Sequence, residues 1–261
     1  MREPEQHPKP PPPDFYMAAI GRSGSTMLAN WLSNPPDRIV FNEPFFLRPG
    51  NSRLLRIQLQ ALDLPVADAE WAQTDESPRE RFGRLMGPRL CGRRWAAKEV
   101  LCEEHVAMTK AFAPPRVLVS VRNIVDVALS FFEKHRLQKN LDRFGDDWVT
   151  EYCLRESAGL LDYLAMLEAS GTPCLVARYE DVTKSANELE RIALFTGWPG
   201  GGEVAANLEA YGRGFEASRH GQSIAVSRHG RDRRAVPKEC VRSAAMIGER
   251  CASYQRRFGY L

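Results

Sequence analysis

The stretch Phe15-Tyr-Met-Ala-Ala-Ile-Gly-Arg-Ser-Gly-Ser-Thr-Met-Leu-Ala-Asn-Trp-Leu32 is the part of the sequence that decides the fold. Its apolar start, Phe15–Ile20, predicts a buried strand. A short turn then leads into a predicted helix at 27–32, which the prolines after Asn34 end. The free N–H groups and the dipole at the start of a helix favour an anion. The stretch therefore predicts a strand, loop and helix that bind a phosphate.

The loop between the strand and the helix has the residue types that such a site needs. Its glycines, Gly21 and Gly24, allow the backbone to approach a ligand closely. Arg22 supplies a fixed positive charge, and hydroxyl groups come from Ser23, Ser25 and Thr26. The alternative interpretation is a plain glycine turn whose helix is capped by a serine or threonine.

The loop differs from the nucleotide triphosphatase motif G-x-x-x-x-G-K-[ST]. Gly24 follows Gly21 after only three positions, and no lysine precedes the pair Ser25-Thr26. The alternative enzyme class is a kinase-like enzyme with a nucleotide-binding P-loop. The missing lysine argues against ATP hydrolysis and thus against this class.

The composition limits the architecture and the partners. The chain has 261 residues, of which 43% are hydrophobic, and this suits one domain over residues 15–261. The proline-rich leader, residues 1–14, is expected to be disordered. A net charge of only +3 predicts no nucleic-acid partner, and no apolar run is long enough to predict a membrane span. The six scattered cysteines predict a reducing, cytoplasmic location.

Predicted strands and helices alternate along the chain. Strands are expected at 15–20, 38–41, 95–100, 116–121 and 174–177. Helices are expected at 27–32, 51–62, 79–86, 103–112, 125–138, 146–169, 185–196 and 241–257, with a loop at 63–78. This order predicts an α/β fold, a mainly parallel sheet with helices on both faces and a P-loop-like phosphate-binding strand, loop and helix.

Charged residues follow several of these strands directly. Glu43, Lys98, Arg122 and Arg178 all lie near predicted strand ends, as does the phosphate loop. In parallel sheets, ligands bind beyond the carboxyl ends of the strands. We therefore expect one site at this edge. For single residues the alternatives are a surface turn for Glu43 and an ion pair with Glu99 or a nearby acid for Lys98.

Three segments in this order resemble the sulfotransferases that use 3′-phosphoadenosine 5′-phosphosulfate (PAPS). Gly21-Arg-Ser-Gly-Ser-Thr26 resembles their 5′-phosphosulfate loop. Val121-Arg-Asn-Ile-Val-Asp-Val-Ala-Leu-Ser130 resembles the 3′-phosphate element, and Ala177-Arg-Tyr-Glu-Asp-Val182 resembles a later strand-to-helix segment. The resemblance covers most of residues 15–199 and implies the sulfotransferase fold.

Within that family the motifs are most similar to the tyrosylprotein and carbohydrate branches. Those branches have an arginine or lysine before Ser-Gly, and the tyrosylprotein type has a glutamate base after the next strand; Arg22 and Glu43 occupy these positions. No histidine lies between Pro8 and Glu104, which disfavours the histidine base of the small-molecule branch. The chain departs from the Golgi branches because it shows no membrane anchor and no disulfide pattern.

The resemblance implies a role for each site residue. Glu43 would be the catalytic base, and a free glutamate, with a pKa of about 4.3, is ionised at neutral pH. Arg22, Lys98 and the loop N–H groups would neutralise the leaving phosphate, so that no metal is required. Arg122 and Ser130 would bind the 3′-phosphate. The donor contacts are thus expected from Arg22, Ser23, Gly24, Ser25, Thr26, Arg122, Ser130 and Arg228.

Arg228 belongs to a basic coil, Arg219–Arg234, that either folds over the donor or is a solvated surface loop. The expected activity is transfer of a sulfuryl group to a hydroxyl of a small molecule, glycan or peptide. The alternative outside enzymes is a sulfotransferase-like module that binds an adenine nucleotide without turnover. A carboxylate at Glu43 argues against that module because it would repel the ligand. The acceptor and the oligomeric state are left open.

Overall fold

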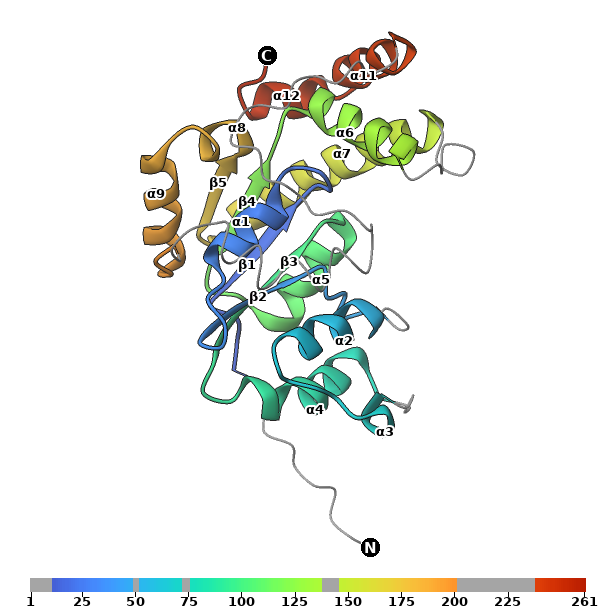
Figure 1. Ribbon diagram of the computed structural model, residues 1–261. Coiled ribbons are helices and arrows are strands. Elements are labelled where there is room, and N and C mark those ends of the chain that lie inside the picture. Colours follow the sequence, from blue (N-terminus) through green and yellow to red (C-terminus); the bar gives the residue numbers. More distant parts are fainter. Residues whose placement is uncertain (1–10, 49–51, 72–75, 138–145, 201–237) are drawn as a thin grey trace, which may run out of the picture.

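The computed structural model of the chain describes residues 11–48, 52–71, 76–137, 146–200 and 238–261 (Figure 1). Within these residues one sheet is formed by β1 (Phe15–Ala19), β2 (Arg38–Asn42), β3 (Arg94–Glu99), β4 (Val117–Val121) and β5 (Cys174–Arg178). The strand order is β2-β3-β1-β4-β5, and every pair is parallel. The predicted α/β fold with a parallel sheet is confirmed.

Helices precede or follow the strands throughout the described residues. They are α1 (Ser25–Leu32), α2 (Ser52–Ala61), α3 (Asp68–Trp71), α4 (Pro78–Leu90), α5 (Cys102–Phe112), α6 (Ile124–Leu137), α7 (Asp146–Ser170), α8 (Tyr179–Val182), α9 (Ala186–Thr196), α11 (Lys238–Arg250) and α12 (Ala252–Arg257). The carboxyl end of each strand leads into a turn at the same edge of the sheet, and these turns carry the candidate site.

Side chains alternate between the two faces of the sheet, as the period of two in a strand requires. In β1, Tyr16 and Ala18 belong to the larger buried cluster, whereas Phe15 and Met17 belong to the smaller one. The smaller cluster includes side chains of α1 and α9, and the larger one includes side chains of α4, α5 and α7. Both faces of the sheet are therefore covered, which explains why the strands are apolar throughout.

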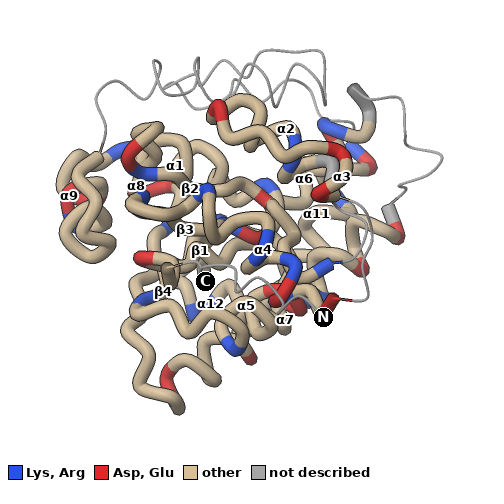
Figure 2. The backbone as a smooth tube through the Cα atoms, turned by 90° about the horizontal axis from the view of Figure 1, so that it is seen from below, with Lys and Arg blue, Asp and Glu red and all other residues tan. Residues whose placement is uncertain are grey.

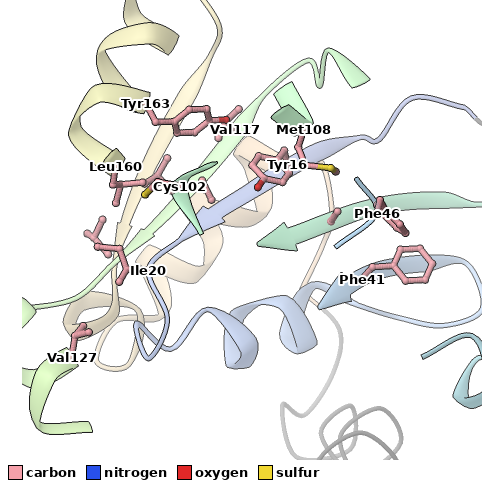
Figure 3. Close-up of a cluster of buried hydrophobic side chains, with 14 of the residues drawn as sticks. Tyr16, Ile20, Phe41, Phe46, Cys102, Met108, Val117, Val127, Leu160 and Tyr163 are labelled. Atoms are coloured by element: carbon pink, nitrogen blue, oxygen red, sulfur yellow. The ribbon is translucent and has the colours of Figure 1, made fainter. Parts of the chain in front are cut away.

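The larger cluster is rich in aromatic rings. Phe41 and Phe46 meet edge to face at 5.6 Å between ring centroids, and Figure 3 shows them side by side. Phe46 also meets Phe82 at 4.5 Å. These contacts fix the chain just after β2, where Glu43 lies.

Some expected boundaries were wrong. The segment 63–78, expected to be a loop, contains α3, and α4 extends to Leu90 instead of ending at 86. Ser77 explains the start of α4, because it forms a reciprocal capping box with Glu80. The expected closing helix at 241–257 is two helices, since Cys251 leaves helical geometry between α11 and α12.

The end of the proline-rich leader contacts the sheet. The indole N–H of Trp95 donates to the carbonyl of Pro11 at 2.8 Å, and that of Trp198 donates to Asp14 Oδ2 at 2.7 Å. Asp14 also pairs with Arg94. Residues 1–10 lie outside the described residues, so the expected disorder of the leader stays a prediction.

Charged residues are spread over the described helices. Figure 2 shows Lys and Arg interspersed with Asp and Glu along the tube, in keeping with the small net charge. Among the described residues, no helix combines the length and the apolar character that crossing a membrane requires.

Candidate active site

The phosphate loop lies between the end of β1 and the start of α1. Gly24, which precedes α1, has φ 83°, and a Cβ there would lie only 2.2 Å from Cδ2 of Tyr179. Glycine is thus required at this position both for the backbone conformation and for the close contact. Arg22 also has a positive φ, 69°, which turns the loop sharply.

Several buried polar atoms near the strand ends have no hydrogen-bond partner among the described residues, and two of them are donors that lie in the phosphate loop or follow β4. These two donors are Oγ of Ser23, a residue with no exposed surface, and Nε of Arg122. Buried polar groups are normally paired, and two unpaired donors close to a phosphate-type loop are consistent with anion binding there. A hydroxyl and a guanidinium N–H are both donors, and they fit the oxygens of an anion.

Arg22, Ser130 and Arg122 form a connected group. Arg22 Nε donates to Ser130 Oγ at 3.1 Å, and Arg122 Nη1 donates to the carbonyl of Arg22 at 3.2 Å. The sequence assigned Arg22 and Ser130 to different ends of the donor, yet the structure brings them into direct contact. The two predicted phosphate elements therefore form one continuous basic surface.

Tyr179 at the end of β5 completes this surface. The guanidinium carbon of Arg122 lies 4.6 Å from the centre of its ring, and the same ring covers Gly24. A guanidinium stacked on an aromatic face keeps its N–H edge free for an anion. Tyr179 belongs to the segment quoted for the resemblance, but no role was predicted for it.

Glu43 and Lys98 form an ion pair at the ends of β2 and β3. Lys98 Nζ lies 2.8 Å from Glu43 Oε1 and donates to Thr26 Oγ1 at 3.2 Å. The Lys98 side chain is fully buried, whereas that of Glu43 keeps 16% of its surface. A buried ammonium needs a partner, and Glu43 supplies it. The ion pair of Lys98 is thus formed with Glu43, and not with the alternative Glu99.

The turn that carries Glu43 has an unusual backbone. Glu43 has φ 50° and Phe45 has φ 48°, and such conformations cost non-glycine residues about 1–3 kcal/mol each. The end of β3 holds the turn, because Glu43 N–H donates to the carbonyl of Lys98 at 2.7 Å and Phe45 N–H donates to Glu99 Oε1 at 2.7 Å. The backbone strain thus occurs at the turn that positions the Glu43 carboxylate.

Glu99 is a buried acid beside this turn. Burial raises its pKa well above the usual value, and the charges of Glu43 and Glu104 add to the rise, while the Phe45 N–H and Lys98 oppose it. Glu99 accepts the Phe45 N–H with Oε1 and in this way helps to hold the turn. In the sequence, only the position of Glu99 next to Lys98 points to this role.

Tyr152 of α7 joins the loops after β1 and β3. Its hydroxyl accepts from Gly21 N–H at 2.9 Å and donates to the carbonyl of Val100 at 3.1 Å. Burial raises the pKa of Tyr152 well above its usual value, and Glu43 is among the charges that add to this. No sequence motif marks Tyr152, because it comes from a helix far along the chain.

His105, the first histidine after the leader, has a structural role. It is fully buried; its Nε2–H donates to the carbonyl of Ala19 at 3.1 Å, and its Nδ1 accepts from Tyr16 at 2.7 Å. Burial lowers the pKa of His105 to about 3, so the ring is neutral at ordinary pH. Its hydrogen bonds hold β1 against α5.

The structure thus brings together most of the predicted site. Each of the described candidates lies at the carboxyl edge of the sheet: Arg22, Ser23, Gly24, Ser25, Thr26, Glu43, Lys98, Arg122 and Ser130. Arg228 and the basic coil, 219–234, lie outside the described residues, so their expected role stays a prediction. Within the described ranges no group of three or more His, Cys, Asp or Glu residues has metal-site geometry.

Solved structures share this architecture. The sulfotransferase domain of the Synechococcus PCC 7002 olefin synthase aligns over 94% of this chain and 97% of its own, with TM-score 0.60 and 16% identity. The sulfotransferase domain from the curacin biosynthetic pathway aligns over 96% and 98%, with TM-score 0.60 and 17% identity. The chain has the sulfotransferase fold.

A further solved structure supports the same fold. Sulfotransferase STF9 from Mycobacterium avium aligns over 98% of this chain and 77% of its own, with TM-score 0.51 and 14% identity. No family model and no curated protein matches the sequence. At these identities the similarity is one of fold, and it does not distinguish the tyrosylprotein or carbohydrate branch from other sulfotransferases.

Proposed function

We propose that this protein is a sulfotransferase that uses PAPS as donor and a hydroxyl group as acceptor. The observation that carries the proposal is the Glu43–Lys98 ion pair, which lies beside a phosphate-type loop whose buried Ser23 hydroxyl has no hydrogen-bond partner among the described residues. A carboxylate next to an anion site has no use in simple anion binding, since the two negative charges repel each other. It suits the removal of a proton from an acceptor.

Each residue of the site has a defined task in this proposal. When bound, PAPS supplies an activated sulfuryl group and a phosphate leaving group. The loop N–H groups, Ser23 and Arg22 hold its 5′ side, and Arg122 with Ser130 holds its 3′-phosphate. Ser25 and Thr26, in the first turn of α1, add hydroxyl groups, and Arg228 of the basic coil adds charge. No metal is assigned a role.

Glu43 accepts the proton of the acceptor hydroxyl at its carboxylate. Lys98 holds Oε1 of Glu43 by an ion pair, which favours the ionised form that a base needs. Thr26 orients the Lys98 ammonium from the α1 side. Charge on the leaving phosphate is met by Arg22 and, once Glu43 is protonated, by Lys98.

A ligand panel tests the donor class. Thermal unfolding is measured with adenosine 3′,5′-bisphosphate, ATP and NAD. A ligand at about 100 times its Kd stabilises by about 2.7 kcal/mol, or roughly 5–10 °C for a chain of this size. We expect this shift for the bisphosphate only. Stabilisation by ATP alone would contradict the proposal and favour a kinase-like enzyme.

The proposed acceptor is a small molecule, a glycan or a peptide. Activity screening would identify it. A cytoplasmic location without nucleic-acid or membrane partners belongs to the same proposal. It rests on the small net charge and on six cysteines that are all free thiols.

A further inference from the structure

The turn between β4 and α6 has an unusual set of backbone contacts. Four consecutive N–H groups, from Arg122 to Val125, each donate to a side-chain oxygen. The acceptors are Tyr254 Oη for Arg122 at 3.4 Å, Glu180 Oε1 for Asn123 at 3.1 Å, Gln255 Oε1 for Ile124 at 3.4 Å and Asn123 Oδ1 for Val125 at 2.9 Å. The N–H groups of residues 122–125 are therefore engaged within the protein.

Two of these acceptors come from α12 at the end of the chain. The Tyr254 hydroxyl also donates to the carbonyl of Arg122 at 3.0 Å, so that it joins both backbone groups of that residue. Gln255 Nε2 donates to Asn123 Oδ1 at 3.3 Å. Tyr254 is 1% exposed and Gln255 3% exposed. Buried hydrogen bonds of this kind fix geometry, because breaking one leaves a buried group unpaired.

The segment after α12 reaches the neighbouring strand end. Tyr260 donates to Glu180 Oε2 at 2.8 Å, and the guanidinium of Arg178 lies 4.5 Å from the centre of the Tyr260 ring. Glu180 accepts from the Arg122 turn with its other oxygen. The C-terminal residues thus join the ends of β4 and β5. In Figure 1, α11 and α12 lie beside α6, at the edge where β4 ends.

These contacts have a consequence for anion binding at the β4 end. Because the N–H groups of residues 122–125 are occupied, they are not available to an anion, and the Arg122 side chain is the donor that the turn offers. Among the described residues Arg122 Nε has no hydrogen-bond partner, and its position depends on the turn. We infer that Tyr254 and Gln255 are positioning residues, which hold the Arg122 turn so that its guanidinium can bind the donor's 3′-phosphate. This inference rests on the proposed function.

The test compares Tyr254→Phe with wild type in the full-length chain. The variant keeps the ring but loses both hydrogen bonds to Arg122. Hydrogen exchange of the amides of Arg122–Val125 should become faster without any ligand. Calorimetry should show about tenfold weaker binding of adenosine 3′,5′-bisphosphate, the effect of one lost positioning contact. Binding of adenosine 5′-monophosphate, which lacks the 3′-phosphate, should stay unchanged.

Tyr163→Phe is the matched control. Tyr163 is 1% exposed and lies on α7, and its hydroxyl is 2.6 Å from Thr109 Oγ1, so this change removes one part-buried hydrogen bond of a buried tyrosine where Tyr254→Phe removes two. It should leave both affinities and the exchange of the turn as in wild type. If Tyr254→Phe does not fold, Gln255→Met removes the contacts to Asn123 and Ile124 and is used instead.

The outcomes separate the inference from the proposed function. If wild type binds bisphosphate and a folded Tyr254→Phe binds it with the same affinity, the inference is overturned but the proposed function is not. Equal losses for bisphosphate and monophosphate also overturn it, since they show general loosening of the fold. Wild-type protein that does not bind bisphosphate contradicts the proposed function and, with it, the role given to the turn.

Discussion

At the residue scale, Lys98 and Glu43, which are far apart in sequence, form one ion pair at the ends of β3 and β2. The ammonium is fully buried and has to be paired, and the only exposed surface of the pair belongs to the carboxylate. The same strand end holds the turn of Glu43 through the carbonyl of Lys98 and the side chain of Glu99. The position of the proposed base is therefore set by β3.

Glu99 gives a prediction about pH and stability. Its pKa in the folded protein is raised, mainly by burial, above the value of about 4.3 in the unfolded chain. Between these two values the folded state holds more protons than the unfolded state, so stability falls as pH rises. Glu99→Gln keeps an oxygen for the Phe45 N–H but cannot ionise, and it should flatten this part of the curve.

The measurement is the free energy of urea unfolding from pH 4 to pH 8 for both proteins. As the pH rises, the free energy of unfolding should fall more for wild type than for Glu99→Gln. The two curves of free energy against pH should therefore converge or cross as the pH falls. Parallel curves over the whole range would show that Glu99 has no raised pKa. Glu43, Glu104 and Lys98 face Glu99, and they are the same in both proteins.

Gly24→Ala tests the shape of the phosphate loop. A Cβ at φ 83° is strained and would lie 2.2 Å from Tyr179. The loop or the ring must move, so we expect binding of adenosine 3′,5′-bisphosphate to fall at least tenfold with a smaller loss of stability. Gly171→Ala is the control, because Gly171 also has a positive φ, 66°, but an added Cβ meets nothing within 4 Å. Wild-type affinity in Gly24→Ala would show that the loop does not contact the nucleotide.

At the scale of elements, much could be predicted from the sequence because strands and helices depend on local patterns. The β-branched run before Arg122 and the strand, loop and helix around Gly24 were located correctly, since period and turn residues are local signals. Tyr152, Glu99 and Tyr254 were missed as parts of the site. They act through contacts between distant elements, and a single sequence carries no signal for such pairs.

Arg122 and Arg178 form a matched pair at neighbouring strand ends. Both guanidinium groups stack on tyrosine rings, Arg122 on Tyr179 at 4.6 Å and Arg178 on Tyr260 at 4.5 Å. Arg122→Ala should weaken bisphosphate binding by about 1.5–3 kcal/mol, the usual contribution of a charge-assisted contact. Arg178→Ala should change it far less. Calorimetry on both variants checks this, and equal effects would remove the assignment of Arg122 to the 3′-phosphate.

At the scale of the whole molecule, the two edges of the sheet have different roles. The carboxyl edge carries the charged site, whereas the opposite edge is closed by structural contacts of Asp14 with Arg94 and Trp198. The sequence predicted the first edge because glycines and charges follow the strands. It did not predict the second, because the proline-rich composition before Asp14 favoured a free leader.

Asp14→Ala should therefore affect stability and not the site. It leaves the buried indole N–H of Trp198 unpaired, which costs about 1–3 kcal/mol, and lowers Tm by roughly 2–4 °C per kcal/mol. Asp14→Asn, which keeps an oxygen acceptor, should lose less. Bisphosphate affinity should equal that of wild type in both variants. A loss of affinity with unchanged Tm would contradict this separation of the two edges.

The central claim is that Glu43 is the catalytic base, and the turnover of Glu43→Gln tests it most directly. Turnover is measured as transfer from labelled PAPS once an acceptor is found, or as breakdown of PAPS before that. We predict a fall of about 10²–10⁴-fold, with unchanged folding and bisphosphate affinity equal to or slightly above that of wild type. Glu76→Gln, which alters an ion pair with Arg84 away from the strand ends, should keep full turnover. Near wild-type turnover in a folded Glu43→Gln protein would contradict the account and place the base elsewhere.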